Sequence, residues 1–74
     1  MDYTKILELA ESKLAPELGY VVNEIKSKIS SGSTGGEIGS LVGGYLKTLR
    51  ELQHPAYLIL KSEIDNYLSQ FIML

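Results

Sequence analysis

The fold of this chain turns on the stretch Ser31-Gly32-Ser33-Thr34-Gly35-Gly36-Glu37-Ile38-Gly39-Ser40-Leu41-Val42-Gly43-Gly44, which begins as a linker and ends as a helix. Its first residues are Ser, Gly and Thr, which favour turns. Thr34 stands three residues before Glu37, the spacing of an N-terminal capping box, so a helix is expected to begin near Gly35. We therefore expect a linker over residues 30–36.

The half that precedes the linker, residues 2–29, carries one apolar stripe at three- and four-residue spacing, which is typical of a helix. Asp2 or Thr4 can cap its N-terminus. Because a proline inside a helix either kinks or breaks it, Pro16 divides this half. The stripe stays nearly in phase across Pro16, which favours one kinked helix over two independent ones. Its members are Ile6, Ala10, Leu14, Leu18, Val21, Ile25 and Ile29.

The half that follows the linker, residues 37–74, is also divided by a proline, Pro55. Before Pro55, a heptad-like seam contains Ile38, Val42, Tyr45, Leu49 and Leu52. After Pro55, the same spacing continues through Tyr57, Leu60, Ile64, Tyr67, Phe71 and Leu74. We expect an all-α fold, either a helical hairpin of two proline-kinked helices or a small four-helix bundle. The predicted core is Ile38, Val42, Tyr45, Leu49, Ile64, Tyr67 and Phe71.

The size of the chain predicts a single domain, residues 1–74, with a thin core. Chains this short usually need a staple or a partner. Cysteine is absent and His54 is the only histidine, so neither a disulfide nor a zinc site is expected. We predict no metal and no cofactor. By elimination, the expected source of extra stability is self-association as a homodimer or a larger oligomer.

Glycines mark the first predicted contact surface. Gly39, Gly43 and Gly44 each cost about 1 kcal/mol relative to alanine within a helix, so some packing should offset them. On a helical wheel their row points away from the heptad seam, which leaves it free for a helix of a second copy. In the alternative interpretation the helix begins late, near Leu41, and the early glycines only extend the loop.

The apolar end of the chain is the second predicted contact surface. It reads Phe71-Ile72-Met73-Leu74 and carries no charge. Such an end either folds back over the core or docks on another copy. The complete predicted interface contains Gly39, Gly43, Gly44, Phe71, Ile72 and Leu74.

Enzymatic chemistry has little support in the sequence, and we expect no activity. No GxSxG motif occurs, no ExxH pair is present, and the glycine-rich stretch lacks the lysine of a phosphate-binding loop. His54 is expected to be a helix-end residue without a special role. The net charge is −2 and the basic residues are scattered, which argues against nucleic acid.

The sequence therefore predicts a small non-enzymatic protein–protein interaction or assembly module whose partner is itself or another helical protein. Uncharged stretches are far shorter than the ~20 residues of a membrane-spanning helix, and no secretory start is visible. A cytoplasmic location is expected. Two alternatives stay open: a peripheral protein that contacts membranes through its apolar C-terminal segment, and a small helical nucleic-acid-binding regulator.

Overall fold

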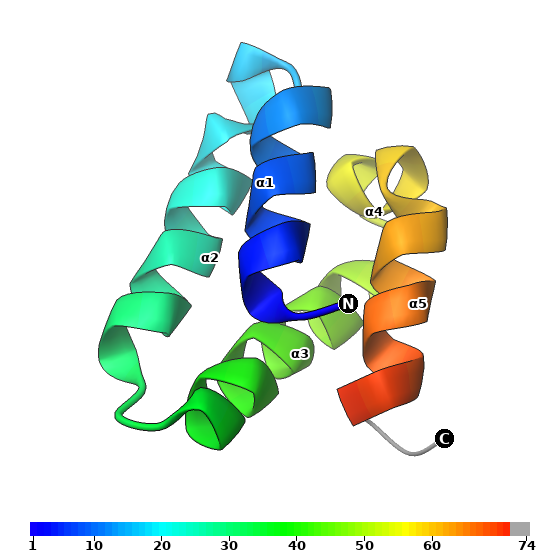
Figure 1. Ribbon diagram of the computed structural model, residues 1–74. Helices are drawn as coiled ribbons and strands as arrows, with labels where there is room; N and C mark the ends of the chain where they lie inside the picture. Colours follow the sequence, from blue (N-terminus) through cyan, green and yellow to red (C-terminus); the bar gives the residue numbers. More distant parts are fainter. Residues whose placement is uncertain (72–74) are drawn as a thin grey trace.

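A computed structural model describes residues 1–71, with the exception of the Phe71 side chain. These residues form an all-α fold, as predicted. The elements are α1 (Tyr3–Lys13), the short 3-10 turn η1 (Pro16–Leu18), α2 (Gly19–Ser31), α3 (Gly35–Glu51), α4 (Pro55–Ile59) and α5 (Lys61–Phe71). In Figure 1, α1 lies between α2 and α5, and α3 packs against all three of them. The Cα radius of gyration is 11.1 Å, close to the ~11 Å of a compact domain of this length.

Pro16 breaks the first half of the chain instead of kinking it. Helix α1 ends at Lys13, and Leu14 and Ala15 are extended, with ψ angles of 138° and 158°. An extended backbone is what a following proline imposes on the residue before it. The chain then reverses, and α2 returns alongside α1 (Figure 1). The expectation of one kinked helix is therefore wrong.

Pro55 also follows a break. After Glu51 the backbone closes a C-terminal cap in which the His54 N–H donates to the Leu49 carbonyl at 3.0 Å and the Gln53 N–H donates to the Arg50 carbonyl at 3.1 Å. Gln53 has a φ of 53°, the left-handed conformation that this type of cap requires. Pro55 then begins α4, which ends at Ile59, with Leu60 as its C-cap before α5.

The linker is shorter than predicted, because α2 continues to Ser31 and α3 begins at Gly35. The predicted cap is confirmed: the Glu37 N–H donates to Thr34 Oγ1 at 3.1 Å. The Glu37 carboxylate accepts from the Ser33 N–H at 3.0 Å. At Gly32 the turn brings two backbones together, since a Cβ there would lie 3.0 Å from the Ile38 nitrogen.

The core lies where these five helices meet. Of the residues predicted for it, Val42, Leu49, Ile64 and Tyr67 are buried, while Ile38 and Tyr45 are half-buried against it; the Phe71 side chain lies outside the described residues. Leu52, which the heptad seam placed on the same face, is 68% exposed. The buried hydrophobic residues in the described part of the chain are Ile6, Ala10, Val21, Ile25, Val42, Leu46, Leu49, Ala56, Tyr57, Leu60, Ile64, Tyr67 and Leu68.

The single chain hides its surface as effectively as a typical monomer. Its accessible area is 4183 Å², whereas a folded monomer of this mass is expected to expose about 4,500 Å². The total area therefore gives no sign of an interior left open in the single chain. Side chains that stay exposed in it are the ones available for self-association.

Candidate functional site

Among the residues that the structure describes, three large aliphatic side chains near the turn from α3 into α4 are strongly exposed. Leu52 is 68% exposed, Leu58 58% and Ile59 47%, and Pro55 is exposed as well. We call these four residues the α4 patch. Pro55, Leu58 and Ile59 are spaced three and four apart, so they share one side of the helix, and this outward side contains no polar residue. Exposed apolar side chains that gather on one side of a helix are typical of a contact site.

The opposite side of α4 explains why the patch faces outward. Ala56 and Tyr57 are buried in the core, and so is Leu60, which follows them. A helix of five residues has room for one buried side, so burying these three turns the remaining apolar side chains to the surface. The residues of the patch on α4 therefore form a second apolar side of this helix, opposite the side that is buried in the core.

His54 fixes the beginning of α4. Its Nδ1 accepts a hydrogen bond from the Ala56 N–H at 3.0 Å, which makes it the N-cap of the helix. Its Nε2 lies 2.8 Å from the Tyr20 hydroxyl on α2, and the two rings meet edge to face with centroids 5.8 Å apart. Since Nδ1 accepts, the ring proton is on Nε2 and is donated to the Tyr20 oxygen. His54 thus has a structural role that its sequence position did not predict.

A polar cluster ties α4 to its neighbours. Asp65 on α5 accepts from the Tyr57 hydroxyl at 2.9 Å and from Lys61 Nζ at 2.9 Å, and Arg50 of α3 lies 3.7 Å from the same carboxylate. The hydrogen bond from Lys61, with help from Tyr57, lowers the pKa of Asp65. The same hydrogen bond raises the pKa of Lys61. The cluster holds α3, α4 and α5 in one arrangement.

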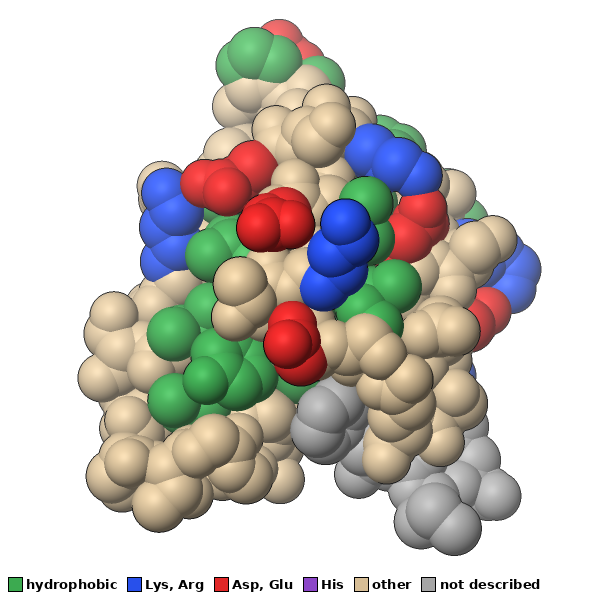
Figure 2. Space-filling model, in the orientation of Figure 1, with side chains coloured by type: hydrophobic (Ala, Val, Ile, Leu, Met, Phe, Trp, Pro, Cys, Tyr) green, Lys and Arg blue, Asp and Glu red, His purple; other side chains and the backbone are tan. Residues whose placement is uncertain are grey.

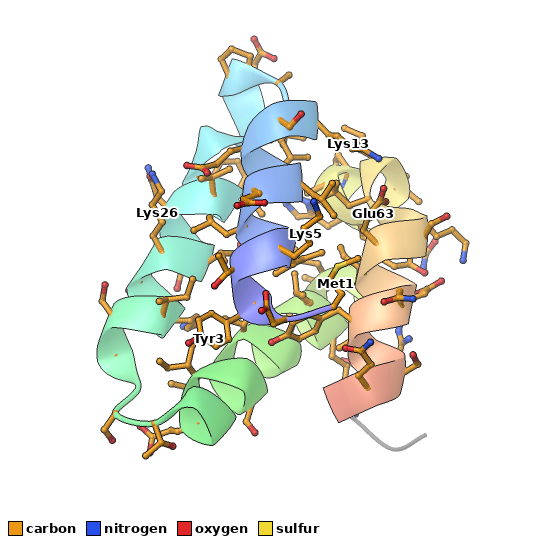
Figure 3. All side chains as sticks on the ribbon, viewed as in Figure 1. Met1, Tyr3, Lys5, Lys13, Lys26 and Glu63 are labelled. Atoms are coloured by element: carbon orange, nitrogen blue, oxygen red, sulfur yellow. The ribbon has the colours of Figure 1, made fainter. Side chains whose placement is uncertain are left out.

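Ion pairs also join helices on the face in Figure 2, where charges of both signs alternate over α1, α2 and α5. Lys13 of α1 pairs with Glu63 of α5, and Figure 3 shows their side chains pointing toward each other. The hydrogen bond from Lys13 lowers the pKa of Glu63. Lys26 of α2 pairs with Glu11 of α1 at 3.3 Å. The charges on this face join helices to one another and do not form a basic or an acidic surface.

A second apolar area is visible in Figure 2 where α1, α2 and α3 meet, close to Tyr3, which Figure 3 labels. The apolar side chains that pack on the core from these helices, Tyr3, Leu7, Val22, Ile29 and Ile38 among them, are half-buried. This area is the open edge of the core. The α4 patch differs from it because its leucines expose more than half of their surface.

The glycines predicted to meet a second copy are placed differently from one another. Gly39 and Gly43 are buried, on the same face of α3 as Val42, and the Tyr67 hydroxyl of α5 donates to the Gly39 carbonyl at 2.9 Å. The prediction that their row points away from the seam is wrong, because α5 packs over this face within the same chain. Gly44 is exposed, and a Cβ there would meet no atom within 4 Å.

The predicted interface at the end of the chain involves Phe71, Ile72 and Leu74. The Phe71 side chain and residues 72–74 lie outside the part that the structure describes. That prediction therefore stays as it was.

The residues that sequence reasoning missed are Leu52, His54, Leu58 and Ile59. A signal for two of them was available, because Leu58 and Ile59 make the segment after Pro55 apolar on more than one side. Leu52 was misplaced because the helix that carries it ends at Glu51. The role of His54 had no local signal, since its partner Tyr20 is 34 positions away.

Within residues 1–71, no group of three His, Asp or Glu side chains is placed to hold a metal ion, and no pocket is present. In the same part of the chain, none of the helices has the length and apolar character needed to cross a bilayer. Comparisons with family models, curated proteins and solved structures found no match. The geometry of the α4 patch is therefore the main guide to function.

Proposed function

We propose that this protein is a small non-enzymatic interaction module that self-associates through the α4 patch. The observation that supports the proposal is the wholly apolar outward side of α4, continued by Leu52 at the end of α3. These side chains do not contribute to the core, because α4 packs on it through Ala56, Tyr57 and the following Leu60. Contact with another apolar surface gives them a role.

A second copy is the partner that the patch fits most simply. In a two-fold dimer the same surface lies on both sides of the interface, so an apolar patch without charges is self-complementary. Standard stable interfaces bury ~800 Å² per partner, more than four side chains provide. We therefore expect a weak dimer whose population rises with concentration.

The charges of the described residues favour a protein partner over nucleic acid. Six basic side chains lie within 4 Å of a carboxylate, and they are Lys5, Lys13, Lys26, Lys28, Arg50 and Lys61. Neutralising phosphates requires a cluster of basic groups, and here these groups are spread out and paired. A gel shift with nucleic acid is accordingly expected to be negative.

The test is the mass of the protein in solution, measured by sedimentation velocity over a range of concentrations. The wild type is expected to shift toward twice its monomer mass as concentration rises, and Leu58→Lys and Ile59→Lys to stay monomeric. Leu41→Lys is the matched control, because Leu41 is an exposed leucine of α3 outside the patch. Far-UV circular dichroism checks that all variants are folded.

A wild type that stays monomeric at every concentration contradicts the proposal. Equal loss of association in Leu41→Lys and Leu58→Lys also contradicts it, because the effect would then not belong to the patch. Two further assays test the alternative functions. Co-sedimentation with neutral vesicles would point to a membrane surface, and capture of a different helical protein would point to a heterologous partner.

A further inference from the structure

We infer that His54 is a protonation-sensitive latch that holds the beginning of α4 to α2. The inference concerns the regulation of the α4 patch, and only its consequence for association rests on the proposed function. The latch itself follows from two hydrogen bonds of one imidazole ring. One leads to the Ala56 N–H at 3.0 Å and the other to the Tyr20 hydroxyl at 2.8 Å.

The ring can make both bonds in only one state. The Ala56 N–H is a donor, so Nδ1 has to carry a lone pair, and the ring is neutral with its proton on Nε2. When His54 is protonated, both nitrogens carry hydrogen. Nδ1–H then faces the Ala56 N–H, donor against donor, and the N-cap is lost. The bond from Nε2–H to Tyr20 does not require the neutral ring, so one arm of the latch opens and the other can stay.

The charged groups on the elements around His54 stabilise the protonated ring only weakly. On α2, Tyr20 contributes its hydroxyl, which is bonded to the ring, and Glu24 pairs with Lys28. On α5, Asp65 is already shared between Lys61 and Arg50 of α3. Glu51, in the last turn of α3, is an exposed carboxylate whose attraction water and salt screen.

The C-terminus of α3 is a second possible source of stabilisation for the protonated ring, because helix C-termini attract cations. Here two carbonyls of the last turn already accept backbone hydrogen bonds. Leu49 accepts from the backbone N–H of His54, and Arg50 accepts from the N–H of Gln53. The loss of the Ala56 bond is therefore the dominant local effect of protonation.

The consequence for the surface follows from the position of α4. Its first residue, Pro55, belongs to the α4 patch, and so do Leu58 and Ile59 one turn later. Protonation of the ring frees the beginning of α4 and disturbs the arrangement of the patch, so self-association weakens when His54 is protonated.

The latch is tested by NMR on the dilute monomer, where association plays no part. Long-range proton–nitrogen spectra are expected to show His54 with its proton on Nε2 at about pH 8. On acidification, the Ala56 amide shift is expected to follow the titration of the His54 ring. The opened population of the first turn of α4 should rise about fivefold, the factor for loss of a typical N-cap.

His54→Asn is the matched variant, because asparagine keeps a side-chain acceptor for the Ala56 N–H but does not titrate. Its Ala56 amide should not respond between about pH 5 and about pH 8. Tyr20→Phe removes only the second arm, so its Ala56 amide should still follow His54.

A ring with its proton on Nδ1 overturns the inference, and so does an Ala56 amide that ignores the titration of His54 or responds equally in His54→Asn. The result is separable from the proposed function. If Ala56 follows His54 while the wild type stays monomeric, the latch stands and self-association fails. If the protein dimerises but Ala56 does not follow His54, the latch is wrong and the α4 patch stands.

Discussion

Gln53 is the residue with the clearest local strain. It adopts a φ of 53° in the cap that ends α3, a conformation that glycine reaches at no steric cost. Its side chain compensates in part, since Nε2 donates to the Arg50 carbonyl at 2.9 Å. Gln53 lies in the chain between Leu52 and Pro55, two residues of the α4 patch.

Replacing Gln53 with glycine is expected to stabilise the protein. Relief of the left-handed strain should raise the free energy of unfolding by about 0.5–1 kcal/mol relative to Gln53→Ala, which lacks the side-chain bond but keeps a Cβ. Urea denaturation of the three proteins measures the difference. An alanine variant as stable as the glycine variant would show that the cap does not require the left-handed conformation.

Gly44 and Gly32 make a matched pair of glycines with opposite expectations. At Gly44 a Cβ meets no atom within 4 Å, so Gly44→Ala should raise the free energy of unfolding by about 1 kcal/mol through helix propensity. At Gly32 the new Cβ presses on the Ile38 backbone, so Gly32→Ala should lower it. Thermal melts followed by circular dichroism distinguish the two, and a stabilised Gly32→Ala would contradict the close approach described at the linker.

Tyr67 predicts how the protein responds to alkali. Burial raises the pKa of its phenol to about 12. Because the folded pKa lies above that of an ordinary tyrosine, about 10, the contribution of Tyr67 to stability is complete below about pH 10. It is lost as the pH rises toward about 12.

The variant Tyr67→Phe separates this effect from general alkaline unfolding. At neutral pH it should lower the free energy of unfolding by about 1 kcal/mol, because the hydrogen bond to the Gly39 carbonyl is lost. Between about pH 10 and about pH 12 its stability should fall less than that of the wild type. Denaturation curves at several alkaline pH values give the comparison, and parallel losses in both proteins would show that Tyr67 is not the group that titrates.

At the scale of the elements, local signals were read correctly and long-range ones were not. The caps at Asp2 and Thr34 are local, since each side chain binds an N–H three residues later, and both are present. The break at Pro16 was misjudged because two antiparallel helices that share one core preserve the same apolar phase as one kinked helix. The side of α3 that α5 covers depends on how the chain turns between these helices, through the cap after Glu51 and through α4.

The junction of α3, α4 and α5 predicts the response to acid. The pKa values of Asp65 and Glu63 are lowered, mainly by hydrogen bonds from Lys61 and Lys13. Their stabilising contribution is present above the unfolded carboxylate pKa, near 4, and is lost as the pH falls through the lower folded values. Melting temperatures from about pH 5 down to about pH 2 should therefore fall less steeply in Asp65→Asn than in the wild type. Glu8→Gln is the control, because the ion pair of Glu8 with Lys5 is long, at 3.9 Å, and exposed.

At the scale of the whole molecule, the thin core inferred from chain length is balanced by efficient packing. The helices leave an accessible area below the average for the mass, and the described residues have no buried polar side-chain atom without a partner. The sequence therefore predicted the helical class and much of the core. It could not predict the α4 patch, because the side of α4 that faces outward depends on the burial of Ala56, Tyr57 and Leu60 in the core.

The exposure of Leu58 and Ile59 in the single chain leads to a prediction about the patch. The double variant Leu58→Lys, Ile59→Lys should unfold within about 0.5 kcal/mol of the wild type at concentrations where both are monomeric, as expected for exposed positions. Urea denaturation at low protein concentration measures this. A large loss of stability would mean that these side chains support the fold, and their exposure would then need another explanation.

The hydrogen bond between Tyr67 and Gly39 also supplies the protein with its own optical probe. The chain contains no tryptophan, so near-ultraviolet signals come chiefly from its tyrosines. The phenol of Tyr67 is locked between α3 and α5, where ring immobility gives a chiral signal that disappears when the two helices separate. Stopped-flow circular dichroism in this band can therefore time the docking of α5 on α3 in unlabelled protein, and Tyr67→Phe provides the blank.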